Sequence, residues 1–255
     1  MKRIASRDNS LFKMLSKLES SARERRETGK TLLDGMHLVT AATLSRQKPE
    51  LIILRESSLD DPEIRPLMDD HEIVVMNDAL FNSISPVKHP TGVLALISIP
   101  ECDQGESEPE FCVFLEAIQD PGNMGSILRS VAASGATDAF LSKGCADPWS
   151  PKVLRAGMGA HFGIRVHVES DIHELVRNFE GNTIVMTLAG SVSLFDLDLK
   201  GRTGFVIGNE GAGISQELCA LASIRCRIPM PGRMESLNAA SAAAICLFER
   251  VRQTA

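Results

Sequence analysis

The chain has 255 residues, of which 44% are hydrophobic and 24% charged, and its formal net charge is −6. This length accommodates one large domain or two small ones, and the composition is typical of a globular protein rather than a disordered chain. No apolar run approaches the roughly 18 residues of a membrane-spanning helix, and the polar amino terminus does not resemble a secretory signal. We therefore expect a cytoplasmic protein.

Metal and disulfide chemistry are not indicated. The six cysteines form no C-x-x-C pair, and most of them lie in apolar runs. The six histidines show no ligand spacing on a helix, and neither H-E-x-x-H nor G-x-S-x-G occurs. The sequence therefore predicts buried, reduced thiols, with no metal site and no hydrolase triad.

The charge is unevenly distributed along the chain. Residues 1–50 hold 11 Lys and Arg against 6 Asp and Glu, a net charge of +5, so the remainder carries −11. A basic arm permits a polyanionic partner. Tyr is absent and Trp149 is the single Trp, so a base-stacking platform for single strands is not expected. Phosphate contacts and shape would therefore dominate any binding of nucleic acid.

The first part of the chain, residues 1–99, predicts a small α/β domain. Leu11, Met14, Leu15 and Leu18 have helical spacing within residues 9–28. Short apolar runs at 51–54, 73–76 and 93–97 predict strands with helices between them. Residues 100–110 are acidic and flanked by proline, which is typical of a linker.

The second part, residues 111–255, alternates strands and helices more regularly. Strand-like runs occur at 112–115, 139–141, 164–168, 183–187, 204–207 and 225–228. Ser150-Pro151 predicts a helix start, and an alanine-rich helix is expected over 238–252. Apolar strands that alternate with helices favour a mostly parallel sheet covered on both faces.

Three segments that follow strand-like runs are candidates for a functional site, because ligands of open α/β sheets bind beyond the carboxyl ends of the strands. Residues 120–129 enter a helix that Asn123 can cap, and Arg129 follows within its second turn. Such a segment is also compatible with a plain strand–turn–helix joint.

The other two segments are rich in glycine or proline. Residues 208–213 have the spacing G-x-x-G-x-G, which is not the dinucleotide fingerprint and disfavours a nucleotide-dependent oxidoreductase. Residues 228–238 form an extended loop before the last helix, where Ser236 or Asn238 is expected to be the N-cap.

Taken in chain order, the three segments resemble the SpoU (TrmH-like) family of RNA 2′-O-ribose methyltransferases. Asn123, Gly125 and Arg129 resemble its N-x-G-x-x-x-R motif, residues 208–211 its G-N-E-G motif, and residues 228–238 its I-P-M…S-L-N motif. Residues 147–160 resemble the second helix of that family. Residues 29–42 and 89–97 resemble a preceding substrate-binding domain that is similar to ribosomal proteins that bind kinked RNA.

The resemblance implies an α/β methyltransferase domain of the SPOUT superfamily with a parallel sheet and a deep trefoil knot, in a homodimer. It implies S-adenosylmethionine as the cofactor, held mainly by the backbone. The implied cofactor-binding residues are Gly208, Ile228 and Leu237, with Leu188 and Met230 as walls.

By the same resemblance, Arg129 engages the ribose 2′-hydroxyl, and Glu210 orients Arg129 or receives charge from it. Asn123, Ser236 and Asn238 complete the implied set of polar catalytic residues. A neutral Arg base is chemically awkward because the pKa of a guanidinium exceeds about 12. We therefore expect Arg129 to polarise the hydroxyl or a neighbouring phosphate.

The resemblance leaves the RNA open. The extra amino-terminal domain favours ribosomal RNA, and tRNA is the alternative within the family. A non-catalytic RNA-binding protein is a further alternative, which the presence of Arg129, Glu210, Ser236 and Asn238 disfavours.

Overall fold

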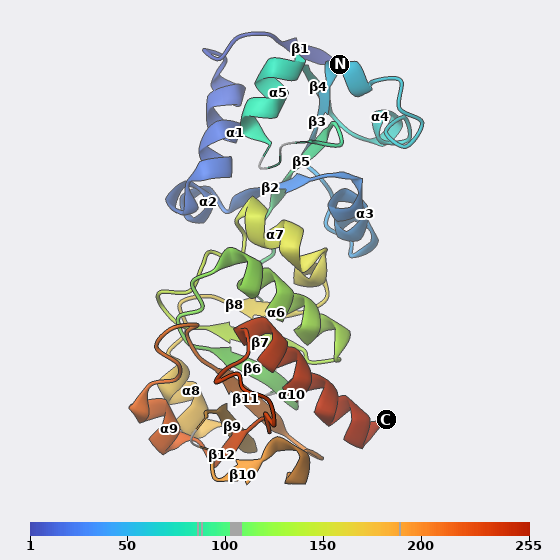
Figure 1. Ribbon diagram of the computed structural model, residues 1–255. Coiled ribbons are helices and arrows are strands. Elements are labelled where there is room, and N and C mark those ends of the chain that lie inside the picture. The colour runs from blue at the N-terminus through green and yellow to red at the C-terminus, as the bar shows by residue number, and fades with distance from the viewer. Residues whose placement is uncertain (86, 88, 103–108, 189) are drawn as a thin grey trace. The chain divides into compact units, whose positions relative to one another are not determined.

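The computed structural model describes residues 1–85, 87, 89–102, 109–188 and 190–255 (Figure 1). It contains two compact units, of which the first comprises Met1–Glu101 and Trp149–Phe162. The second comprises Cys102–Pro148 and Gly163–Ala255. Most of the expected linker, residues 103–108, lies outside the described residues.

The first unit contains a mixed sheet of five strands. Its spatial order is β1 (Lys2–Ile4), β4 (Ile73–Met76), β3 (Leu51–Arg55), β5 (Val93–Ser98) and β2 (Lys30–Asp34). The first three strands in this order are parallel, and β5 runs antiparallel to both of its neighbours. The three expected strands are confirmed. Strands β1 and β2 were not predicted, because neither is a purely apolar run.

Helices cover the sheet of the first unit. They are α1 (Ser10–Ser20), α2 (Ala22–Thr28), α3 (Met36–Leu44), α4 (Leu67–Asp70) and α5 (Asp78–Ile84). The helical pattern over residues 9–28 is divided between α1 and α2 at Ser21. The backbone of Ser21 is extended, and its hydroxyl accepts a hydrogen bond from the Glu24 amide at 3.2 Å, which starts the second helix.

A late segment of the chain belongs to the first unit by its contacts. Helix α7 (Pro151–Gly157) packs against β2, and the Thr31 hydroxyl donates to the Trp149 carbonyl at 2.6 Å. Ser150 caps α7 with Pro151 in its first turn, as the sequence predicts. The division expected from the sequence places this segment in the second domain, whereas its contacts group it with the first unit.

The second unit contains a seven-stranded sheet in which every strand pair is parallel. Its order is β10 (Val192–Ser193), β12 (Ile224–Arg227), β9 (Asn182–Met186), β11 (Thr203–Ile207), β6 (Phe111–Leu115), β7 (Asp138–Leu141) and β8 (Arg165–His167). The six expected strands and the parallel sheet are confirmed. Only the two-residue strand β10 lacked a recognisable pattern.

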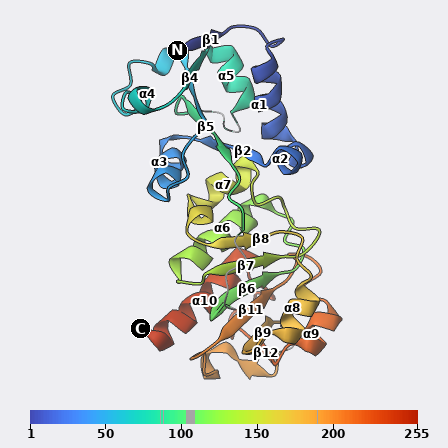
Figure 2. The same cartoon turned by 180° about the vertical axis from the view of Figure 1, so that it is seen from behind.

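Both faces of this sheet carry helices (Figures 1 and 2). Helices α6 (Pro121–Ala133) and α10 (Ala239–Thr254) pack together on one face. Helices α8 (Ile172–Asn178) and α9 (Gln216–Leu221) lie on the other, where Ile172 and Leu218 join a buried cluster with Phe114, Val185 and Val206. Two covered faces explain why these strands are almost entirely apolar.

The strand order of this sheet indicates where a ligand would bind. From β6 the chain adds β7 and β8 on one side, and then crosses to build β9 and β11 on the other. The carboxyl ends of β6 and β11 meet at this switch point, where Leu115 pairs with Ile207. Open parallel sheets bind ligands at such points. No helix within the described residues is both long and apolar enough to cross a membrane.

Candidate active site

The loops that follow β6 and β11 are joined by a side chain that the sequence analysis did not single out. Asn209 Nδ2 donates to the Ala117 carbonyl oxygen at 2.8 Å, and its Oδ1 accepts from the amides of Gly211 and Ala212, each at 2.9 Å. A second link joins the Ser215 amide to Glu116 Oε2 at 2.8 Å. Both loops are therefore held together at the carboxyl edge of the sheet. The position of Asn209 inside the G-N-E-G segment is the signal that could have identified it.

Asp120, and not Asn123, caps helix α6. Its Oδ1 accepts from the Asn123 amide at 2.8 Å, and Pro121 occupies the first turn. The structure therefore does not use Asn123 as the cap, although the sequence allowed it. Asn123 lies inside the first turn, which leaves its side-chain amide available for contacts with other loops.

Asn123 instead connects the three motif segments. Its Nδ2 donates to Glu210 Oε1 at 3.0 Å, and its Oδ1 accepts from Asn238 Nδ2 at 2.8 Å. Asn238 is the N-cap of α10, because its Oδ1 accepts from the amides of Ala240 at 2.9 Å and Ser241 at 3.2 Å. Of the two expected caps, the structure therefore uses Asn238. We refer to Asn123, Glu210 and Asn238 as the polar triad.

The carboxylate of Glu210 is oriented by the start of α6. It accepts from the backbone amides of Gln119 and Asp120, each at 3.2 Å, in addition to the Asn123 side chain. Burial raises the pKa of Glu210, but these hydrogen bonds outweigh it and hold the pKa below its ordinary value. At neutral pH this group is therefore a negatively charged hydrogen-bond acceptor with a fixed orientation.

Arg129 does not pair with Glu210. It lies on α6, six residues beyond Asn123, and is exposed. Within the described part of the chain, its guanidinium makes no hydrogen bond or ion pair, and Glu210 is engaged by other groups. The expected contact between these two residues is therefore not formed in this chain, and Arg129 is accessible to a ligand or to another chain.

A cavity of about 520 Å³ opens beside the triad, at the carboxyl ends of β9, β11 and β12. Ligand sites commonly span about 300–1,000 Å³. Its lining includes all five residues expected to bind a cofactor, together with two of the expected catalytic residues: Leu188, Gly208, Ile228, Met230, Leu237, Glu210 and Ser236. The other expected catalytic residues, Asn123, Arg129 and Asn238, are not among the described lining residues.

Two glycines at or next to the cavity leave no room for a side chain: Gly208, which lines it, and Gly190, whose carbonyl accepts from the lining residue Arg227. A Cβ atom at Gly208 would lie 2.4 Å from the Gly213 carbonyl oxygen. A Cβ atom at Gly190 would lie 2.3 Å from the carbonyl carbon of Cys226. At Gly208 the absence of a side chain allows close approach to the backbone. The other lining residues are mostly apolar or small, and Glu210, Glu235 and Arg227 add two carboxylates and one guanidinium.

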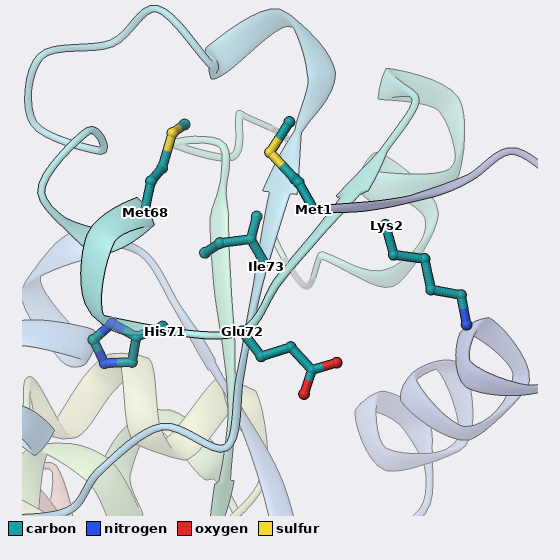
Figure 3. Close-up of a pocket in the computed structure, with 6 residues that line it drawn as sticks. All are labelled: Met1, Lys2, Met68, His71, Glu72 and Ile73. Carbon is teal, nitrogen blue, oxygen red and sulfur yellow. The ribbon is translucent and has the colours of Figure 1, made fainter.

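A second cavity, of about 420 Å³, lies in the first unit at the edge formed by β1 and β4 (Figure 3). Its lining residues are Met1, Lys2, Met68, His71, Glu72 and Ile73. Figure 3 shows the polar ends of Lys2, His71 and Glu72 pointing in different directions, so they do not converge on one ligand atom. Within the described residues, no group of three or more His, Cys, Asp or Glu side chains could hold a metal ion. The cavity beside the polar triad is therefore the candidate active site.

Fold and site together define a class of protein. The second unit is a parallel α/β domain with a cavity at the carboxyl edge of its sheet, glycines in the cavity lining and a fixed carboxylate. This arrangement is typical of α/β domains that bind a small ligand at the switch point of the sheet, and the loop after β11 lacks the dinucleotide fingerprint.

Comparison with known proteins identifies the family. The family model described as the SpoU rRNA Methylase family matches residues 110–248, and the MRM3-like substrate binding domain matches residues 9–95. The chain belongs to the SpoU rRNA methylase family, as the motifs predict.

Relatives and solved structures are similar over nearly the whole chain. An uncharacterized tRNA/rRNA methyltransferase of Synechocystis is 31% identical, over 98% of this chain and 93% of the relative. The 23S rRNA (guanosine(2553)-2′-O)-methyltransferase RlmP of Bacillus subtilis is 28% identical, over 97% of this chain and 98% of the relative. The AdoMet-bound rRNA methyltransferase of Sinorhizobium meliloti has a TM-score of 0.84 at 29% identity, covering 100% of this chain and 98% of that chain.

Proposed function

We propose that this protein is an S-adenosylmethionine-dependent methyltransferase that modifies a ribose 2′-hydroxyl in ribosomal RNA. The observation that carries the proposal is the cavity that gathers the expected cofactor residues beside a fixed carboxylate. The named 2′-O-methyltransferases among its relatives support the same chemistry.

The cavity fits the proposed cofactor in size and in the chemistry of its wall. Backbone groups near Gly208, Ile228 and Leu237 would hold the adenosine, and the aliphatic side chains of Leu188 and Met230 would pack against it. Glu210, Glu235 and Arg227 give the lining a formal charge of −1, which favours a cationic ligand over an anionic one. When bound, S-adenosylmethionine supplies an electrophilic methyl group.

The chain's own residues position the nucleophile. Asn123 and the α6 amides hold Glu210 ionised and oriented, and Asn238 ties this group to α10. The exposed Arg129 guanidinium would contact the 2′-hydroxyl or a neighbouring phosphate through its planar set of donors. Ser236, on the same cavity, would bind the incoming ribose. These roles divide the site into a preorganised half and an RNA-facing half.

We also propose that the region expected to bind RNA, residues 1–99, selects the substrate and that residues 111–255 carry the methyltransferase. The match of residues 9–95 to a substrate-binding domain supports this division, as does the net charge of +5 in residues 1–50. Ribosomal RNA is favoured because several full-length relatives are named for it, and tRNA is the alternative. The trefoil knot and the homodimer that the resemblance implies stay predictions, as does the cytoplasmic location.

The proposal is tested by transfer of a tritiated methyl group. Purified protein and labelled S-adenosylmethionine are incubated with ribosomal RNA or with tRNA, both from cells that lack the gene. We expect label in ribosomal RNA, in nuclease-resistant dinucleotides that identify a 2′-O-methyl group. Label in tRNA would select the alternative substrate. Absence of label together with absence of cofactor binding by calorimetry would contradict the proposal.

A further inference from the structure

The guanidinium that lines the cavity is tied to the backbone of a neighbouring loop. Arg227 is the last residue of β12 and one of the lining residues. Its Nη1 donates to the Gly190 carbonyl oxygen at 2.7 Å. Gly190 follows β9, which pairs with β12 in the sheet. A side chain of one strand therefore holds the backbone that follows its neighbour.

The backbone around Gly190 lies directly on β12. A Cβ atom at Gly190 would lie 2.3 Å from the carbonyl carbon of Cys226 and 2.7 Å from the Arg227 nitrogen, so only glycine allows this approach. The Gly190 amide donates to the Thr187 carbonyl at 3.1 Å, and the Thr187 amide donates to the Cys226 carbonyl at 3.0 Å. Thr187 and Gly190 are thus both fastened to the end of β12, the latter also through Arg227.

The fastened residues enclose a part of the cavity wall. Thr187 and Leu188 both line the cavity. The Leu188 side chain is 63% exposed, so packing within the chain does little to fix it. Its position therefore depends on the backbone before it, at Thr187, and after it, at Gly190.

We propose that Arg227 is a positioning residue for the cofactor, which holds Leu188 at the cavity wall through the Gly190 carbonyl. The inference rests on the proposed function, in which the adenosine of S-adenosylmethionine packs against Leu188. A hydrogen bond from a charged donor is among the stronger ones in proteins. Without it, the wall is in place in a smaller fraction of molecules, and the apparent affinity falls by that fraction.

The charge of Arg227 has a separate effect, which two ligands distinguish. S-adenosylhomocysteine has the same adenosine as S-adenosylmethionine but lacks the methyl group and the positive charge on sulfur. Loss of the Arg227 charge alone would favour the cationic ligand and leave the uncharged sulfur of the other indifferent. Loss of the contact with Gly190 weakens both ligands, because it acts on the adenosine that they share.

The test is calorimetric titration of wild type and Arg227→Met with both ligands. We expect the Kd for S-adenosylhomocysteine to rise about 10-fold, as for the loss of one hydrogen bond from a charged group, and the Kd for S-adenosylmethionine to rise no more than this. Arg227→Lys keeps a charged donor and should bind more tightly than Arg227→Met. An unchanged Kd for S-adenosylhomocysteine in Arg227→Met would overturn the proposal.

Arg225→Met is the matched control. Arg225 lies on the same strand, and its Nε donates to the Cys219 carbonyl at 2.7 Å, but it is not among the described lining residues. The control removes the same kind of bond away from the cavity and should leave both Kd values unchanged. Unfolding midpoints verify that the variants are folded. If Arg225→Met weakens both ligands as much as Arg227→Met does, the effect belongs to the stability of β12, and the proposal is wrong.

Turnover separates positioning from catalysis. At saturating S-adenosylmethionine, Arg227→Met should keep kcat on ribosomal RNA within about 2-fold of wild type while KM for the cofactor rises, because only ground-state binding is lost. A fall in kcat with an unchanged KM would contradict the positioning role.

Hydrogen exchange tests the contact without any ligand. In Arg227→Met, the amides of Thr187 and Gly190 should exchange at least about 5-fold faster than in wild type, because local opening costs less free energy. The same amides should be unaffected in Arg225→Met. Unchanged exchange would refute the hold of Arg227 on this backbone. A wild-type protein that binds neither ligand would instead contradict the proposed function, so the two failures are distinct.

Discussion

The side-chain amide of Asn123 donates to the carboxylate of Glu210 at 3.0 Å and so joins the first turn of α6 to the loop after β11. The two residues are 87 positions apart in the chain. Because the same amide accepts from Asn238 at 2.8 Å, the orientation of three loops depends on one side chain.

Asn123→Asp should impair methyl transfer more than cofactor binding. An Asp cannot donate to Glu210, and its charge raises the pKa of the neighbouring carboxyl. We expect kcat on ribosomal RNA to fall at least about 10-fold. The Kd for S-adenosylmethionine should change little, because Asn123 does not line the cavity. Asn82→Asp, at an exposed position of α5, is the matched control. An unchanged kcat would show that the contact has no part in the reaction.

Gly208→Ala should weaken cofactor binding. The added Cβ would lie 2.4 Å from the Gly213 carbonyl oxygen, so the loop after β11 must move. Overpacking of this kind costs about 1–3 kcal/mol, which corresponds to a rise in Kd of about 5-fold to about 150-fold if the cost falls on the bound state. Gly232→Ala meets nothing within 4 Å and should bind S-adenosylmethionine normally in the same calorimetric titration. Equal affinities in the two variants would argue against the assigned cavity.

Arg129→Lys should lower activity without lowering stability. The exposed guanidinium makes no described contact within the chain, and Lys retains its charge but lacks the planar donor pair. We expect kcat to fall about 100-fold or more, with an unchanged unfolding midpoint. Arg177→Lys, at an exposed position near the end of α8, should change neither kcat nor the unfolding midpoint. Near-wild-type turnover of Arg129→Lys would remove this residue from the proposed chemistry.

Asn209→Ala should destabilise the second unit. The substitution leaves the Ala117 carbonyl and the amides of Gly211 and Ala212 without their partner. The contact with the Ala117 carbonyl is partly buried, whereas the two amides are exposed and can be hydrated, so we expect a loss of about 1 kcal/mol in the free energy of unfolding. Urea denaturation measures this loss, and Asn178→Ala at an exposed helix end is its control. If both variants unfold at the same urea concentration, the two loops do not depend on Asn209.

Glu249→Gln should reduce stability in a pH-dependent way. Hydrogen bonds from Arg252 and then Gln253 lower the pKa of Glu249 to about 2, from an ordinary value of 4.5. A lowered pKa means that the ionised form stabilises the fold above about pH 4.5 and that this contribution disappears as the pH falls through about 2. The variant and the wild type should differ in their free energy of unfolding by up to about 1 kcal/mol, because the partner Arg is exposed to solvent. This difference should be constant from pH 7 to pH 5. If the difference in the free energy of unfolding grows as the pH falls, the prediction is contradicted.

The sequence by itself determined the elements that depend on local pattern. The run FCVFL is apolar because both faces of its strand are covered, so strand β6 could be predicted from the sequence pattern. Ser150-Pro151 started α7 as predicted, because a cap and a first-turn proline act within a few residues. The motif order also identified the family, which the matches to residues 110–248 and 9–95 confirm.

The tertiary structure alone decided which side chains meet. Local pattern suggested that Asn123 caps its own helix, but the adjacent Asp120 satisfies the helix amides and leaves Asn123 to bind Glu210 and Asn238. The three-residue strand β1 forms because it pairs with β4. Its own sequence shows no apolar run that would predict a strand. The position of Cys102 beside His167 was likewise not predictable from the sequence, because the two residues are 65 positions apart. Hydrogen bonds between distant segments depend on strand order and loop closure, and no local periodicity or capping preference encodes them.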